Sequence, residues 1–479
     1  MQQLTGLDAA FLTLDSPTAY GHVGSVSVLD PPAGGEALTL ERLTELIESR
    51  LHLVPPFRRR LVEVPFGLDQ PYWMEDPDFD IEFHVRELAL PAPGDDRQLA
   101  VQAARLHARP LDHRRPLWET YLIHGLQGGR QALYMKVHHA AIDGVSGNDL
   151  LAALMDTSPE PRDTGEPDSW RPETQPGAAE LLVRSAASLA TNPVRAVRVS
   201  VGIVRSLPAL VTSPARPWLP LIDRYVLRRD RGVVLSAPPL IAPATPFNKN
   251  IGPHRRWAFT SLPLAQVKEI KNAAGTTVND VVMALCAGAL RTWLQKHDAL
   301  PKEPLLASVP VSIRTDEQKG THGNRVSSII AALPTNLADP AGRLAAVHEA
   351  MRAAKEQHNA LPAELLTDIA QFSMPALANQ ASRLATRLRL LERVPPFNLI
   401  ISNVPGPTVD LYLCGARLDG IYPLSAIADG QGLNLTVLGS KGKLNFGALA
   451  DRDLVPDIEL IIDALTDELV ALADAVGVG

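Results

Sequence analysis

Cysteine is scarce in this chain of 479 residues, which contains only Cys286 and Cys414. Two cysteines do not imply a disulfide framework, and a reducing cytoplasmic compartment fits best. Lys and Arg are missing from the first forty residues, so the charged start of a secretory signal is missing too. We therefore expect a cytoplasmic protein.

Long apolar runs are also missing. A membrane-spanning helix needs roughly 18 or more consecutive apolar residues. The longest candidate runs begin at Val199 and Val281, and Arg205 and Arg291 interrupt them much earlier. We therefore do not expect the chain to span a bilayer, although lying on one stays open.

The chain has no excess of positive charge and no evident repeat. A formal net charge of -7 argues against a general nucleic-acid binder, which needs a basic face. Hydrophobic residues at 46% and charged residues at 21% are typical of a globular protein. The length indicates two or three domains, or one fold built from two halves.

Composition divides the chain into three regions. Residues 1–158 mix strand-like and helix-like segments, residues 159–254 are rich in Pro and Arg, and residues 255–479 alternate strands and helices again. This order predicts two α/β halves joined by a long crossover. Apolar spacing predicts helices over 40–53, 97–107, 264–274 and 278–294, another from 143 onward, strands over 132–137, 305–311, 326–333 and 398–402, and a hairpin over 433–449.

The crossover is strongly basic. Between Leu181 and Arg231 it contains nine arginines and only two acidic residues, Asp223 and Asp230, with apolar residues interspersed. Such a segment could lie on an anionic lipid surface. Helices packed against the body with their arginines in water are an equal alternative.

The sharpest local feature is an apolar strand that ends in His138 and His139, followed by a turn at Asp143 and Gly144. Adjacent side chains on a strand point to opposite faces, so only one histidine can face a given cleft. By themselves these residues also fit ordinary structure, since Asp143 is a suitable N-cap for the next helix. A metal site would need a third ligand at a defined spacing, and none stands out.

The segment from His138 to Gly144 matches the HHxxxDG motif of the CoA-dependent acyltransferase superfamily. That superfamily includes chloramphenicol acetyltransferase, peptide-synthetase condensation domains and wax ester synthases. Landmarks over nearly the whole chain resemble the bacterial wax ester synthase/diacylglycerol acyltransferase family. They occur in the order Leu7–Phe11, His22–Gly24, Pro56–Leu61, Arg115–Glu119, Val278–Asp280, Val309–Arg314, Gly323–Asn324 and Asn403–Pro407. The DFGWG signature of the plant branch is absent, the nearest string being Asn445–Ala448.

The resemblance implies two chloramphenicol-acetyltransferase-like halves with mixed sheets and an active site at their interface. It makes His139 the general base that takes a proton from a bound alcohol while the alcohol attacks an acyl-CoA thioester. An unperturbed pKa of about 6.5 suits proton uptake and release near neutrality. His138 is expected to support the geometry. No protein nucleophile, metal or resident cofactor is implied, because acyl-CoA enters as a substrate.

Further site residues follow from the same resemblance. Asp143 is expected to pair with Arg60 or Arg314, and the sequence does not choose between them. Gly144 is placed with the substrate, and Asn279 lies in an Asn-Asp motif near the active centre.

Three of these segments have structural readings as well. Thr277 to Asp280 also fits a capping box at a helix start. Ser312 could donate a hydrogen bond near the carbonyl or simply end a strand. Trp118 is expected to be structural and to shape an acyl channel, and the segment 403–407 is expected to be a rigid turn.

The resemblance therefore predicts transfer of a long-chain acyl group to diacylglycerol or a long-chain alcohol. Two alternatives stay open. One is an acyltransferase of the same superfamily with a polyketide or sugar-lipid acceptor, and the other is a non-catalytic lipid-droplet protein. Acyl-CoA and the acceptor are the expected partners, peripheral contact with the inner membrane or lipid droplets stays open, and no nucleic acid is expected.

Overall fold

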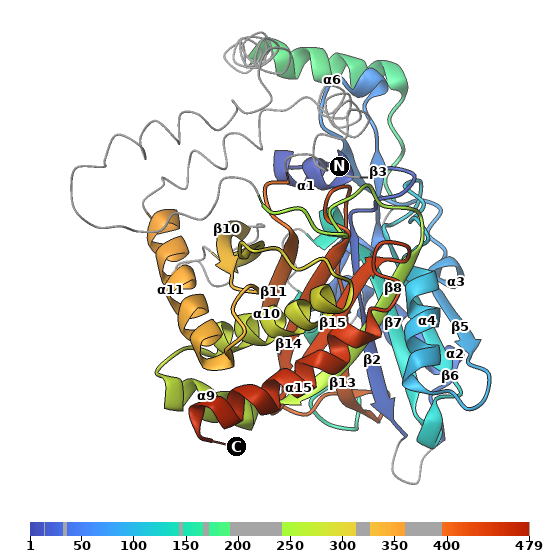
Figure 1. Ribbon diagram of the computed structural model, residues 1–479. Helices are drawn as coiled ribbons and strands as arrows, with labels where there is room; N and C mark the ends of the chain where they lie inside the picture. Colours follow the sequence, from blue (N-terminus) through green and yellow to red (C-terminus); the bar gives the residue numbers. More distant parts are fainter. Residues whose placement is uncertain are drawn as a thin grey trace.

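Two six-stranded sheets lie at the centre of the computed structural model, with helices around them (Figure 1). The structure describes residues 1–13, 15–31, 36–142, 147–165, 172–191, 242–312, 326–359 and 395–478. Most of the basic crossover, and also Asp143, Gly144 and Arg314, lie outside these residues.

The first sheet has the strand order β12-β13-β2-β7-β6-β5. Its strands are β2 (His22–Asp30), β5 (Val85–Ala89), β6 (Trp118–His124), β7 (Gln131–His138), β12 (Tyr412–Leu413) and β13 (Ala416–Leu424). Strands β5 and β6 are parallel and the other neighbours are antiparallel. The predicted strand over 132–137 is β7, with one residue more at each end.

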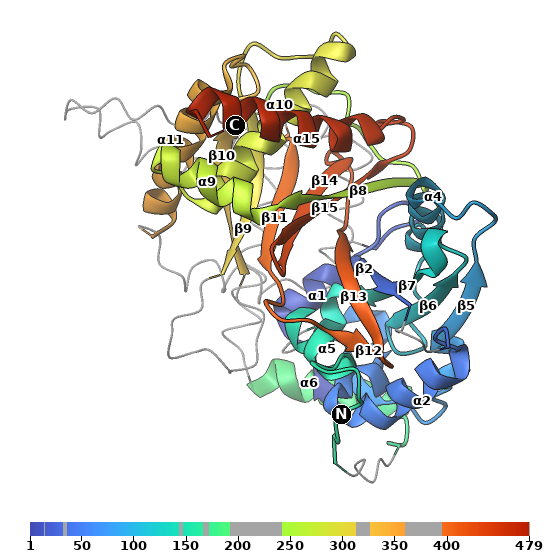
Figure 2. The ribbon, with the colours of Figure 1, turned by 90° about the horizontal axis from the view of Figure 1, so that it is seen from below.

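The C-terminal part of the chain supplies strands to this first sheet. Strand β13 pairs with β2, from Arg417 opposite Asp30 to Leu424 opposite Gly24, and Figure 2 shows it beside β2. Without β13, β2 would be a bare sheet edge with unpaired backbone groups. The two halves are therefore interlocked, which the composition of the chain does not reveal.

The second sheet has the order β10-β9-β11-β14-β15-β8. Its strands are β8 (Arg255–Pro263), β9 (Leu305–Ser312), β10 (Val326–Leu333), β11 (Leu399–Pro405), β14 (Leu433–Ser440) and β15 (Lys443–Asp451). Strand β11 is parallel to both β9 and β14, and the other pairs are antiparallel. Both sheets are mixed, as the α/β prediction requires, and β14 and β15 form the predicted hairpin.

Helices α9 (Leu264–Ala274), α10 (Val278–Lys296), α11 (Pro340–Asn359) and α15 (Glu459–Val476) accompany the second sheet. Every residue of α10 from Asp280 to Leu290 is buried. A helix that is apolar on most faces belongs in a core, and α10 packs against all three of the other helices. No single helix in the described ranges is long and apolar enough to cross a membrane; α9 and α10 pass that test only as a pair bent by 102°.

The remaining elements surround the first sheet. They are β1 (Gln2–Gln3), α1 (Gly6–Thr13), α2 (Leu40–Arg50), β3 (Arg59–Val62), β4 (Tyr72–Glu75), α3 (Ile81–His84), α4 (Asp96–His107), α5 (Gly147–Leu154), α6 (Ala178–Thr191) and the short 3₁₀ turns η1 (Leu51–Leu53), η2 (Pro55–Arg58), η3 (Pro65–Gly67), η4 (Gln127–Gly129) and η5 (His139–Ile142). Strands β1, β4 and β3 form a small third sheet. The predicted helix over 40–53 is α2 followed by η1.

One hydrophobic cluster joins the two halves. It combines Tyr134 of β7 with Trp257 of β8, Tyr422 of β13 and Leu449 of β15, all buried. The Trp257 indole N–H donates to the Pro423 carbonyl at 3.1 Å, and α4 packs against β8. The β7 strand that carries the two histidines is thus braced by both halves.

Candidate active site

The two histidines at the end of strand β7 lie in different environments. All eight residues of β7 are buried, and the His138 side chain is only 1% exposed. The His138 N–H donates to the Leu117 carbonyl of the neighbouring segment at 2.9 Å. The next N–H, of His139, donates to the Gly21 carbonyl on the other side at 2.9 Å. The chain then turns into η5, which leaves His139 partly exposed.

The His139 imidazole lies against α1. Its ring stacks on Phe11 with centroids 3.9 Å apart and planes 15° apart. Burial lowers the pKa of His139 to about 4, although a hydrogen bond to its own main chain acts in the opposite direction. A ring N–H is the donor of that hydrogen bond. His139 is therefore neutral near pH 7. It is a weaker base than a histidine with the unperturbed pKa that the sequence-based prediction assumed.

The His138 ring is held by polar contacts on both nitrogens. Its Nδ1 accepts the Ala140 N–H at 3.1 Å, so Nδ1 has no proton and the neutral ring has its proton on Nε2. That Nε2 lies 3.4 Å from both carboxylate oxygens of Asp15. Asp15 also accepts the Gly21 N–H at 2.6 Å and contacts His113 Nε2 at 2.8 Å.

Asp15, His113 and His138 thus form a cluster whose ligand-type atoms lie within 4.8 Å of one another. A metal ion needs a lone pair on each nitrogen that binds it. Because Ala140 donates to Nδ1 of His138, Nε2 could bind a metal only as an anion. The arrangement therefore favours a hydrogen-bonded cluster. Sequence reasoning missed it because Asp15 and His138 are 123 positions apart and no local pattern links them.

The close packing of His138 and α1 around position 21 requires a glycine there. A Cβ atom there would lie 2.8 Å from His138 Nε2 and 2.8 Å from the Phe11 carbonyl oxygen. Both approaches are too close for a side chain, so a glycine is what allows β2, α1 and the histidine pair to meet.

At the N-terminus of α10 the structure contains the predicted capping box. Thr277 accepts the Asp280 N–H, and the Asp280 carboxylate accepts the Thr277 N–H. Asp280 also contacts His348 Nδ1 at 2.8 Å. The Asn279 side-chain oxygen accepts from Asn403 at 3.2 Å, which ties α10 to the end of β11. The prediction of a rigid turn over 403–407 was wrong for Asn403–Pro405, which pair with β14.

The other predicted residues have structural surroundings. Trp118 is buried between Phe57 and His84, and its indole N–H donates to the Phe57 carbonyl at 2.8 Å. Arg60 lies 3.4 Å from Asp76 and donates to Gln175. Ser312 is the last residue of β9. Because Asp143 and Arg314 lie outside the described residues, the choice of arginine for Asp143 stays a prediction.

Comparison with known proteins places the chain in a family. The family model for the wax ester synthase/diacylglycerol acyltransferase catalytic domain matches residues 4–282 of the sequence. The family model for the C-terminal domain of the same family matches residues 322–473. This chain belongs to the wax ester synthase/diacylglycerol acyltransferase family. It is accordingly an O-acyltransferase of an acyl-CoA-dependent family, and the sequence-based assignment is confirmed.

Relatives of this acyltransferase match along its full length. A putative diacylglycerol O-acyltransferase of Mycobacterium tuberculosis is 39% identical over 476 residues, covering 99% of this chain and 100% of the relative. The wax ester synthase/diacylglycerol acyltransferase from Marinobacter aquaeolei VT8 has a TM-score of 0.69 at 31% identity, covering 99% and 100% of the two chains. A trichothecene 15-O-acetyltransferase from Fusarium sporotrichioides shares the fold, with a TM-score of 0.57 at 12% identity and 98% and 94% coverage.

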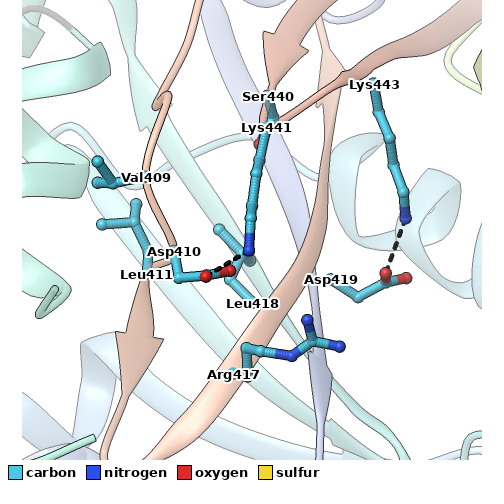
Figure 3. A pocket seen from close by; sticks show the side chains of 9 residues that line it. All are labelled: Val409, Asp410, Leu411, Arg417, Leu418, Asp419, Ser440, Lys441 and Lys443. Carbon is cyan, nitrogen blue, oxygen red and sulfur yellow. Dashed lines mark hydrogen bonds and ion pairs between the residues drawn. The ribbon is translucent and has the colours of Figure 1, made fainter. Parts of the chain in front are cut away.

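A charged depression in this acyltransferase lies where the β14–β15 hairpin meets β13. Figure 3 shows Lys441 pointing toward Asp410 and Lys443 toward Asp419. Arg417 also lines this depression, and it pairs with Asp30. All three cations already have a carboxylate partner, so an incoming anion would have to compete for them. Neither His138 nor His139 lines this depression.

Proposed function

We propose that this acyltransferase moves a long-chain acyl group from acyl-CoA to the hydroxyl of diacylglycerol or of a long-chain alcohol, with His139 as the general base. The observation that carries the proposal is the state of His139. Its side chain is partly exposed at the end of the buried strand β7 and stacks on Phe11, and burial lowers its pKa to about 4, which favours the neutral imidazole. Acyl-CoA is a substrate in this scheme, and no resident cofactor takes part.

In the proposed reaction both substrates are bound together. The lone pair of His139 takes the hydroxyl proton as the alcohol oxygen bonds to the thioester carbonyl carbon. The C–S bond then breaks, and the imidazolium returns the proton to the departing CoA sulfur. A pKa near 4 makes proton uptake by His139 less favourable but proton return more favourable. Positioning and stabilisation of the oxyanion must supply much of the rate.

Asn279 is proposed to act at the substrate side. It lies in the first turn of α10, where unpaired N–H groups and the helix dipole favour developing negative charge. Its contact with Asn403 holds its carboxamide in place. Gly144 and Ser312 are kept as proposed substrate-side residues on the resemblance alone, and Asp143 as a structural residue that pairs with an arginine.

The test is release of free CoA by the purified protein with palmitoyl-CoA and either dioleoylglycerol or hexadecanol. We expect His139→Ala to lower kcat by about 10²–10⁴-fold, the usual contribution of general acid–base catalysis. His124→Ala is the matched control, since His124 is also partly exposed but lies at the opposite end of β6 and contacts Glu87. Retention of a tenth or more of kcat in His139→Ala would exclude this histidine as the base.

The acceptor is decided by competition. Equal concentrations of dioleoylglycerol and hexadecanol in one reaction, with product separation, give the ratio of the two kcat/KM values. Turnover of an acyl group bound to a carrier protein, with none from CoA, would instead indicate the alternative acceptor class.

We further propose that the basic segment between Leu181 and Arg231 binds an anionic lipid surface, where the acceptors are found. Each basic residue near such a surface contributes about 1 kcal/mol at physiological ionic strength. Co-sedimentation with vesicles containing phosphatidylserine, but not with neutral vesicles, is the expected result. Equal binding to both vesicle types, or none, would contradict it.

A further inference from the structure

We propose that Asp15 is the positioning residue of the His138-His139 pair, holding both histidines through one carboxylate. This inference rests on the proposed role of His139 as base. The proposed role of Asp15 is exerted through the backbone and the rings that it contacts.

The carboxylate of Asp15 lies at the centre of three contacts. One oxygen accepts the Gly21 N–H at 2.6 Å, and the other contacts His113 Nε2 at 2.8 Å. His138 Nε2 lies 3.4 Å from both oxygens, a long and bifurcated contact. Of the three partners, Gly21 has the shortest contact, so the strongest support comes from the residue directly before β2.

Gly21 connects Asp15 to the backbone of His139. The residue whose N–H is held by Asp15 also supplies the carbonyl that accepts the His139 N–H at 2.9 Å. A displacement of Gly21 therefore shifts the acceptor on which the base depends. Since a 1 Å misplacement of a reacting group can cost about 10²-fold in rate, small changes at Asp15 should be measurable in kcat.

The His138 ring provides a second connection between Asp15 and the η5 turn. Its Nδ1 accepts the Ala140 N–H at 3.1 Å, which orients the first peptide after His139. Its Nε2–H points to Asp15, so the carboxylate fixes the ring from the other side. The ring is thus a bridge between Asp15 and the backbone of the η5 turn.

His113 completes the cluster from the segment that leads into β6. Its side chain is 33% exposed, compared with 20% for Asp15 and 1% for His138. The hydrogen bond to Asp15 raises the pKa of His113. His113 can therefore be replaced with less risk to folding than the two inner members.

The kinetic test uses Asp15→Asn, which keeps the size of the side chain and removes its charge. We expect kcat to fall at least tenfold, with KM for palmitoyl-CoA within threefold of wild type. His113→Gln should lower kcat about threefold. The double variant should be no slower than Asp15→Asn, because the two residues act through one carboxylate. Glu87→Gln, which removes a comparable histidine–carboxylate contact with His124 at 2.9 Å, should leave kcat unchanged.

A second readout is independent of activity. Hydrogen–deuterium exchange should accelerate in the peptide spanning residues 137–142 in Asp15→Asn and in His113→Gln, because the His139 and Ala140 amides lose fixed acceptors. Exchange there should not change in Glu87→Gln. If wild-type protein released no CoA, the proposed function would fail, whereas this exchange difference would still decide whether Asp15 positions the pair.

Three results would overturn the proposal. The first is a kcat of Asp15→Asn within threefold of wild type together with unchanged exchange over 137–142. The second is a loss expressed entirely in KM. The third is loss of wild-type activity on dialysis against EDTA with recovery on addition of Zn²⁺, which would make the cluster a metal site.

Discussion

At the scale of single residues, burial decides what His139 can do. An exposed histidine titrates near 6.5, but loss of hydration in this site disfavours the imidazolium and moves the pKa to about 4. Buried His84 is shifted in the same direction, also to about 4, by the same cause. The motif led to the prediction that His139 is the base, and its surroundings set the direction in which its basicity changes.

The shifted pKa gives a prediction for activity. The proposed base His139 is active when neutral, so kcat/KM should be constant down to about pH 5 and fall below that, with a midpoint near 4. The sign follows from the direction of the shift, since a lowered pKa keeps the imidazole unprotonated further into the acid range. A pH–rate profile checks this, with circular dichroism at each pH to show that the fold persists. A midpoint near 6.5 would contradict a desolvated base.

At the scale of elements, β7 and α4 are joined by a buried cation. Lys136 in β7 is fully buried, and its Nζ donates to the carbonyls of Leu106 and Arg109 at 3.3 and 3.0 Å. These carbonyls lie at and just beyond the end of α4, where a helix dipole favours positive charge. Glu119 of β6 lies 3.5 Å away. Lys136 therefore connects β7, the strand that leads to the two histidines, to α4, which packs against β8 of the other half.

Lys136→Met should destabilise the protein by about 3–5 kcal/mol, because it leaves Glu119 and two carbonyls buried without their cation. Adding Glu119→Gln should recover part of that loss. Urea unfolding provides the measurement. As a control, Lys443→Met removes an exposed pair with Asp419 and should cost less than about 1 kcal/mol. Equal losses in the two single variants would show that burial of the pair is unimportant.

At the scale of the whole molecule, the contact between the two sheets is close enough to exclude a side chain at one point. A Cβ on Gly447 of β15 would lie 1.9 Å from the Pro423 carbonyl oxygen of β13 and 3.1 Å from the Trp257 indole nitrogen. This glycine lets β15 of the second sheet pack closely against β13 of the first sheet.

We expect Gly447→Ala to cost at least about 2 kcal/mol, since backbone must move to admit the methyl group. Gly439→Ala is a matched control in the same hairpin, where the nearest atom to a new Cβ is 3.8 Å away. Thermal unfolding compares the two, and acyl transfer should fall together with stability only in Gly447→Ala. Similar melting temperatures for both variants would mean that the sheets can separate without cost.

The sequence by itself determined the local elements and the family. Apolar periodicity predicted α9, α10 and the β14–β15 hairpin, because the side chains that must be buried repeat with the period of the element. The motif at His138 and His139 identified the acyltransferase superfamily, and landmarks along the chain identified the family. All of these signals are carried by residues close together in the sequence.

Tertiary structure alone decided the rest. Strand β13, from the C-terminal part of the chain, pairs with the edge of β2 in the first sheet. The residues of a strand do not by themselves specify which edge it will pair with. The meeting of Asp15, His113 and His138 depends on how the segment after α1, strand β7 and the segment before β6 pack together. The basicity of His139 depends on how far that packing removes water from its ring.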